Sequence, residues 1–172
     1  MRTQLHQVLS EWDGKDTAPL ERSYASFQAE TDLVGYLVDL GEDERCQRGA
    51  TWLLKHHLEK SGSGLPEQLA AKHAAFAPKL TDWEARLHFL QYFEHLQIPE
   101  HLEDPLRQMI DNGLTSENKF LRAWSHYALA VLAQRFPAHE SKALKILRTA
   151  GERETAGSVK VRIRKALEKL EA

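Results

Sequence analysis

Residues 121–132 read LRAWSHYALAVL, and this stretch decides the fold of the chain. Arg122 follows an apolar residue, and small or apolar residues then recur at intervals of three and four, which places them on one face of an α-helix. Basic residues repeat this opening at intervals of 38, 36 and 38 residues: Arg48, Arg86, Arg122 and Lys160. A period of this length is typical of helical repeat proteins.

Each copy of the repeat has a leucine ten positions after its basic residue: Leu58, Leu96, Leu132 and Leu170. The first copy fits least well, because Gln47 and Lys55 fall on the stripe that is apolar in the other copies. We expect its helix to turn toward four other residues, which are Cys46, Ala50, Leu53 and Leu54. No stretch alternates with the period of two that is typical of a half-buried strand, so the sequence predicts an all-α fold.

The copies at Arg122 and Lys160 resemble HEAT repeats, in which each unit is a pair of antiparallel helices and an apolar–basic pair opens the second helix. HEAT repeats often carry an acidic or amide residue in the turn before that helix, and three copies have one: Glu44, Asp82 and Asn118. Asp82 and Asn118 are also residue types that cap helix N-termini, whereas the last copy has Ala156 there. The resemblance covers roughly residues 31–172 and implies an α-α superhelix.

The predicted architecture is one HEAT-like solenoid domain over residues 1–172, with about four helix pairs behind an N-terminal helical cap. The cap is expected over residues 1–30, because a stack of repeats must cover its exposed end. The four pairs are expected at residues 31–60, 66–97, 99–136 and 138–171.

The composition excludes several classes of protein. With 42% hydrophobic and 28% charged residues, the chain has the balance of a soluble globular protein. Its longest unbroken apolar stretch is far shorter than the ~20 residues of a membrane-spanning helix, so no membrane partner is expected. The N-terminus lacks the apolar middle of a signal peptide and Cys46 is the single cysteine, which together predict a cytoplasmic protein.

A HEAT-like solenoid implies a concave surface lined by the second helix of each pair. The residues of these helices that point away from the predicted core form the candidate partner-binding site: Trp52, His56, Leu90, Glu94, His126 and Tyr127. Trp and Tyr dominate the energetics of many interfaces because they combine a large contact area with a polar group. The alternative is that Trp52, Leu87 and Leu90 fill the seam between neighbouring repeats. The other tryptophans, Trp12, Trp83 and Trp124, are expected in the core.

Positive charge gathers at the C-terminal end of the chain. Residues 137–170 carry nine Lys or Arg against four Glu, whereas the whole chain has a net charge of −2. Three of these residues, Lys160, Arg164 and Lys165, form a candidate anion-binding surface. The alternative is an ordinary solvated helix face, with Glu168 or the nearby Glu152 and Glu154 as neutralising partners.

No catalytic, cofactor or metal site is predicted from the motifs. The nine histidines lack ligand spacing, since His88 and His95 lie about 10 Å apart along a helix. The HEAT-like di-iron hydroxylases repeat a His-Glu dipeptide across their units, whereas His139-Glu140 stands alone. Cys46 has basic neighbours, but it lies on the expected core side of its helix and is predicted to be a buried, inert thiol.

Two functions fit these observations. The first is a non-catalytic interaction module or scaffold that binds an unidentified protein partner through its concave face. The second is nucleic-acid binding, because the HEAT-like DNA alkylation-repair glycosylases hold DNA on a basic concave surface. Binding of a DNA duplex usually requires positive charge along a whole face, which favours the first hypothesis.

Overall fold

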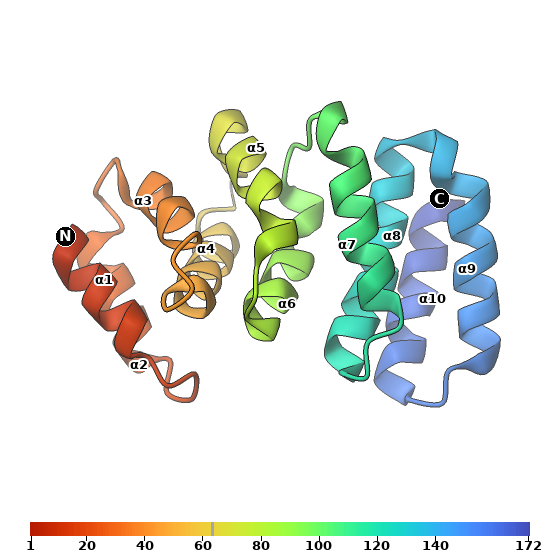
Figure 1. Cartoon of the computed structure of the whole chain (residues 1–172), viewed down its shortest axis with the longest axis horizontal. Coiled ribbons are helices and arrows are strands. Elements are labelled where there is room, and N and C mark those ends of the chain that lie inside the picture. The colour runs from red at the N-terminus through yellow and green to blue at the C-terminus, as the bar shows by residue number, and fades with distance from the viewer. Residues whose placement is uncertain (63) are drawn as a thin grey trace. The chain divides into compact units, whose positions relative to one another are not determined.

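A computed structural model describes residues 1–62 and 64–172 of the chain (Figure 1). The described residues contain ten α-helices and four short 3₁₀ turns, and no strand occurs among them. The predicted all-α fold is therefore confirmed for this part of the chain. No helix within it is both long enough and apolar enough to cross a membrane.

The sequence predicts one continuous domain, whereas the contacts gather into two compact units, residues 1–97 and residues 98–172. The boundary falls between the second and third predicted helix pairs. The first unit contains six α-helices: α1 (Arg2–Glu11), α2 (Ala18–Phe27), α3 (Leu33–Leu40), α4 (Gln47–Ser61), α5 (Glu67–Phe76) and α6 (Trp83–Tyr92). Two 3₁₀ turns, η1 (Ala77–Lys79) and η2 (Phe93–His95), extend α5 and α6.

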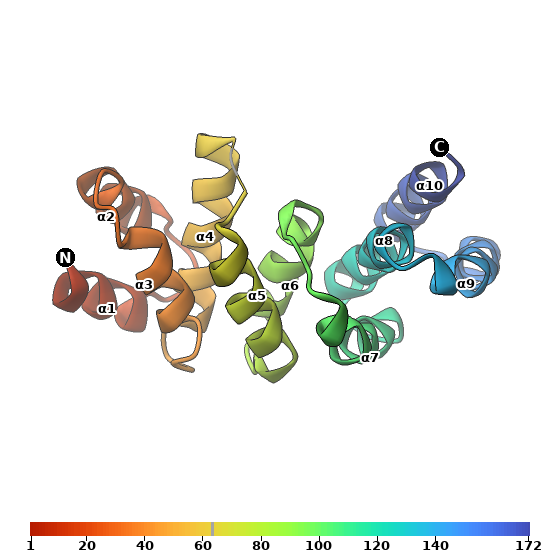
Figure 2. The ribbon, with the colours of Figure 1, turned by 90° about the horizontal axis from the view of Figure 1, so that it is seen from above.

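The second unit contains four α-helices: α7 (Glu103–Leu114), α8 (Lys119–Arg135), α9 (Glu140–Arg153) and α10 (Gly157–Glu171). The 3₁₀ turns η3 (Glu100–Leu102) and η4 (Pro137–His139) precede α7 and α9. Helix α8 is the centre of this unit and contacts α7, α9 and α10 (Figure 2). The stretch at residues 121–132 thus forms the helix that the rest of the unit surrounds.

The core of the first unit confirms how α4 was expected to turn. Cys46, Ala50, Leu53 and Leu54 are all fully buried, and they face the core together with Leu37, Phe89 and Phe93. Gln47 is buried as well, although its amide is polar. Its Oε1 accepts hydrogen bonds from Thr81 N–H (2.9 Å) and Asp82 N–H (3.2 Å), so the repeat stripe keeps a polar residue whose acceptor is satisfied.

The second unit packs tightly because small residues line its central helix. Ala128, Ala130 and Ala133 of α8 are fully buried, and so is Leu132, as the repeat register predicts. Gly113 lies within α7, which continues to Leu114. An added Cβ at Gly113 would lie 2.0 Å from Ser125 Oγ, so the glycine allows α7 and α8 to approach closely.

Helix caps follow the prediction from the repeat. The Asp82 side chain accepts a hydrogen bond from Ala85 N–H at the start of α6, and Asn118 accepts from Phe120 N–H and Leu121 N–H at the start of α8. Ala156 gives α10 no side-chain cap. The Glu154 carboxylate instead accepts from Thr155 N–H (3.0 Å) and Ala156 N–H (2.9 Å), which satisfies the turn before α10.

Candidate functional site

Aromatic side chains gather on the first unit, where the end of α1, α2 and α4 meet. We call this group the aromatic surface, and it consists of Trp12, Tyr24, Trp52, His56 and His57. Trp52 and His56 are one turn apart on α4, and their rings stack at 5.0 Å with an interplanar angle of 16°. Both side chains are partly exposed, so the stack is accessible from solvent.

Trp12 extends the aromatic surface beyond α4. Its ring centroid lies 6.4 Å from that of Trp52, and its Nε1–H donates to the Asp16 carbonyl oxygen at 2.7 Å. The Arg48 guanidinium lies over the Trp12 ring, 5.7 Å from the centroid. The connecting loop requires Gly14, since φ there is +82° and an added Cβ would lie 2.1 Å from Arg48 Nη1.

Tyr24 of α2 contacts the two histidines of the aromatic surface. Its ring meets His56 edge-on at 4.9 Å, and its hydroxyl shares a 3.0 Å hydrogen bond with His57 Nδ1. Burial, followed by the neighbouring His56, lowers the pKa of His57. The imidazole of His57 is therefore neutral near pH 7, and its bond to the Tyr24 hydroxyl involves no charged group.

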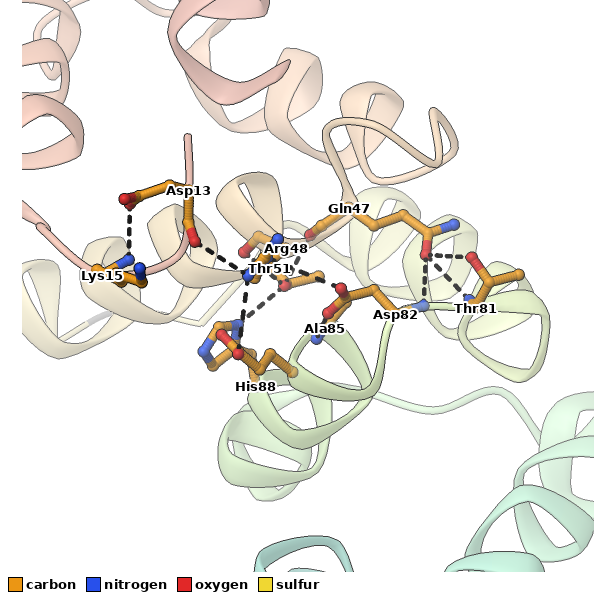
Figure 3. Close-up of polar contacts among 10 residues, drawn as sticks. Asp13, Lys15, Gln47, Arg48, Thr51, Thr81, Asp82, Ala85 and His88 are labelled. Atoms are coloured by element: carbon orange, nitrogen blue, oxygen red, sulfur yellow. Dashed lines mark hydrogen bonds and ion pairs between the residues drawn. The ribbon is translucent and has the colours of Figure 1, made fainter. Parts of the chain in front are cut away.

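A polar network around Arg48 and Thr51 connects α4 to the start of α6 (Figure 3). Arg48 Nε lies 3.7 Å from Asp82 Oδ2, and its Nη1 lies 3.8 Å from Glu84 Oε1. Thr51 Oγ1 shares a 3.1 Å hydrogen bond with His88 Nδ1 in the buried interior. These contacts fix the orientation of α4, which carries Trp52 and His56.

In the first unit the predicted partner-binding residues lie on different elements: Trp52 and His56 on α4, Leu90 on α6 and Glu94 in η2. Trp52 and His56 are partly exposed within the aromatic surface, and Glu94 is partly exposed in η2. The assignment of Leu90 to a binding surface is wrong, because its side chain is only 4% exposed. Leu90 is buried together with Ala85 and Phe89 on the core side of α6, whereas Trp83 and Arg86 of the same helix are exposed.

In the second unit His126 also differs from its predicted role, since it is 3% exposed. Its Nδ1 hydrogen-bonds to the Arg122 carbonyl oxygen at 2.7 Å, one turn earlier on α8, and burial lowers its pKa. Tyr127 is partly exposed and makes an edge contact with Trp124, with 5.8 Å between ring centroids. The Arg162 guanidinium lies 3.6 Å from the centroid of the Trp124 ring.

The three predicted anion-binding residues, Lys160, Arg164 and Lys165, are all exposed on α10. Arg164 Nε lies 3.8 Å from Glu168 Oε1, as the helical spacing predicts. Glu154 does not neutralise α10, because its carboxylate binds Arg122, with 2.8 Å between Oε2 and Nε. That pair connects α8 to the turn before α10 and leaves the charges of α10 facing solvent.

Sequence reasoning missed the outer members of both aromatic groups. Trp12 and Trp124 were expected in the core, but both are partly exposed, and Trp83 is 43% exposed. The contacts of Tyr24 with His56 and of Arg162 with Trp124 were not predicted, because the two partners of each contact lie on different helices. Comparison of the chain with protein-family models, curated proteins and solved structures gave no match.

Proposed function

We propose that the chain is a non-catalytic, HEAT-like interaction module that binds a protein partner through the aromatic surface of its first unit. The observation that carries this proposal is the stacked, partly exposed pair of Trp52 and His56 on α4. A cytoplasmic location remains part of the proposal.

The composition of the aromatic surface suits binding. Trp and Arg are enriched at the energetic centres of interfaces, and Trp12 and Arg48 lie beside the central stack, while the buried Tyr24 supports it. Their contacts also restrain the side chains before any partner arrives. Binding then costs less side-chain entropy, which favours affinity for a given contact area.

Contacts between successive helix pairs support the HEAT-like part of the proposal. In the first unit, the repeat residue Arg48 pairs with Asp82 in the turn of the next predicted pair. In the second unit, Arg122 pairs with Glu154 in the corresponding turn. The same basic position therefore contacts the following turn in both units, as expected of stacked repeats with a common register. A superhelical arrangement of all four pairs is the proposed extension of this pattern.

An affinity-capture experiment with matched variants tests the proposal. We expect the chain to retain a specific set of proteins, and we expect Trp52→Ala combined with His56→Ala to lose them. Phe120→Ala is the control, because Phe120 is 50% exposed in the second unit and lies outside the aromatic surface. Helical circular dichroism must be unchanged in both variants. Retention of the same proteins by the double variant would contradict the proposal.

A second candidate function, nucleic-acid binding, is favoured by one observation in the second unit. Arg162 stacks on Trp124, and α10 also exposes Lys160, Arg164 and Lys165. Cations next to aromatic rings are typical of surfaces that bind single strands. This function predicts retention on DNA that falls steeply with salt, and weaker retention when the three exposed residues are changed to Gln.

A further inference from the structure

We propose that His6, Asp43 and Cys46 form a binding site for a thiophilic divalent cation such as Zn²⁺ on the first unit. The proposal goes beyond the interaction function and does not depend on it. It rests on the placement of three ligand atoms of different chemistry.

The three atoms lie close to the arrangement that a metal ion requires. His6 Nε2 and Asp43 Oδ2 are 3.1 Å apart, and these two atoms and Cys46 Sγ all lie within 4.8 Å of one another. With Zn–N and Zn–O bonds near 2.1 Å and a Zn–S bond near 2.3 Å, ligand atoms of a tetrahedral site are about 3.3 to 3.8 Å apart. Shifts of about 1 Å in side-chain position would therefore complete the coordination.

The local fold explains why these residues meet. Asp43 and Cys46 belong to one turn between α3 and α4, because Cys46 N–H donates to the Asp43 carbonyl oxygen at 2.8 Å. Their side chains consequently point to the same side of the turn. Helix α1 packs against α4 and brings His6 to that side from a position 37 residues earlier. Because His6 lies 37 residues before Asp43, the spacing of ligand residues along the sequence does not predict this cluster.

The chemistry of the three groups selects the kind of cation. One sulfur, one imidazole nitrogen and one carboxylate oxygen suit Zn²⁺ or Co²⁺, whereas Mg²⁺ and Ca²⁺ prefer oxygen atoms alone. The Arg45 backbone N–H donates to Asp43 Oδ1 at 3.0 Å and its Nη2 donates to Oδ2 at 3.2 Å, which orients the carboxylate. The thiol now lies 3.9 Å from the His6 carbonyl oxygen, and coordination would release its proton to solvent.

The proposed site is open to solvent on one side, and its three protein ligands leave the fourth position of a tetrahedral metal ion unfilled. Cys46 is fully buried, but the side chains of His6 and Asp43 are 35% and 30% exposed and border solvent. A cation can therefore enter from the side of His6 and Asp43 and reach the sulfur. Water would occupy the fourth position of a tetrahedral complex.

Titration of the chain with Co²⁺ tests the site directly. Cys46 is the single cysteine of the sequence, so a sulfur-to-cobalt charge-transfer band can arise from this residue alone. We expect this band to appear together with visible absorption of tetrahedral intensity, to saturate at one equivalent of Co²⁺, and to disappear when Zn²⁺ is added. We also expect Zn²⁺ to raise the melting temperature, because it binds the folded chain.

Variants separate a three-ligand site from chance binding at one group. Cys46→Ser should abolish the charge-transfer band, and His6→Gln or Asp43→Asn should weaken Co²⁺ binding at least about tenfold. His101→Gln, an exposed change in the second unit, is the control and should leave binding unchanged.

Because His6 is partly exposed, His6→Gln is expected to fold, so the proposal can be tested even if Cys46→Ser proves unstable. Absence of the charge-transfer band in the wild-type chain would overturn the proposal. An unchanged Co²⁺ affinity in both His6→Gln and Asp43→Asn would also overturn it, since the sulfur would then bind cobalt without the other two residues.

Discussion

His73 and His88 are buried in the first unit, and each shares a hydrogen bond with one hydroxyl group. His73 Nε2 lies 2.6 Å from the Tyr92 hydroxyl, and His88 Nδ1 lies 3.1 Å from Thr51 Oγ1. Burial lowers the pKa of both imidazoles to about 4, from an ordinary value near 6.5. The unfolded chain therefore binds protons between pH 6.5 and pH 4 that the folded chain does not bind.

This difference predicts that the chain loses stability in mild acid. The free energy of unfolding should fall between pH 7 and pH 5 by about 2 kcal/mol for each histidine, and the contribution of these two histidines should flatten below about pH 4. Urea denaturation of the wild type, His73→Leu and His88→Gln measures it, and each variant should show a smaller slope with pH. Equal unfolding free energies at pH 7 and pH 5 in the wild type would contradict this assignment.

Leu132 tests the repeat register at a single position. Its side chain is fully buried in the second unit, ten residues after Arg122. Leu132→Ala should lower the free energy of unfolding by about 2 to 5 kcal/mol, through lost apolar burial and the cavity left behind. Lys142→Ala, an exposed change on α9 of the same unit, should change it by less than about 0.5 kcal/mol. Similar effects of the two changes in urea denaturation would show that the register is wrong there.

At the scale of elements, the pair between Arg122 and Glu154 fastens α8 to the turn before α10. Hydrogen bonds from Arg122, followed by that from Ala156 N–H, hold the pKa of Glu154 at about 2. The stability that this carboxylate provides is therefore complete above about pH 4.5 and is lost as the pH falls toward 2. Glu154→Gln should lower the free energy of unfolding by about 2 kcal/mol at pH 7.

The matched control for this element is Glu152→Gln, because Glu152 is exposed on α9 and lies two residues away. It removes the same charge without breaking the pair. Thermal and urea unfolding at pH 7 compare the two variants. Equal unfolding free energies of Glu154→Gln and the wild type would show that the pair between Arg122 and Glu154 does not stabilise the fold.

The helices themselves could be predicted well from the sequence. The residues at which some helices begin, and the side-chain contacts between helices, could not. Helix α4 begins at Gln47 and α8 at Lys119, so the predicted pairs at residues 31–60 and 99–136 do not by themselves give the starts of these helices. Residues 42–46 and 115–118 are almost entirely polar, so apolar spacing gives no boundary there, and the cap at Asn118 marks the start of α8. Trp52 and His56 were found because both lie on one helix. Their contacts with Trp12 and Tyr24 depend on packing between helices, which repeat spacing does not encode.

At the scale of the whole molecule, the chain consists of two compact units, each with a hydrophobic core of its own. We predict that residues 1–97 expressed alone keep their helical circular dichroism. Burial raises the pKa of the Cys46 thiol to about 11, so this thiol should also react slowly with a thiol reagent at pH 8 in the fragment. Fast reaction of Cys46 without denaturant would show that the first unit needs residues 98–172 to fold.

Site-specific photocrosslinking tests the central claim most directly, namely that a protein partner binds the aromatic surface. A benzophenone amino acid is placed at position 60, an exposed site one turn after His56 on α4, or at position 75, an exposed site on α5 of the same unit. We predict that position 60 crosslinks to the proteins retained in affinity capture and that position 75 does not. Crosslinks of equal strength from both positions, or none from position 60 while capture persists, would contradict this claim.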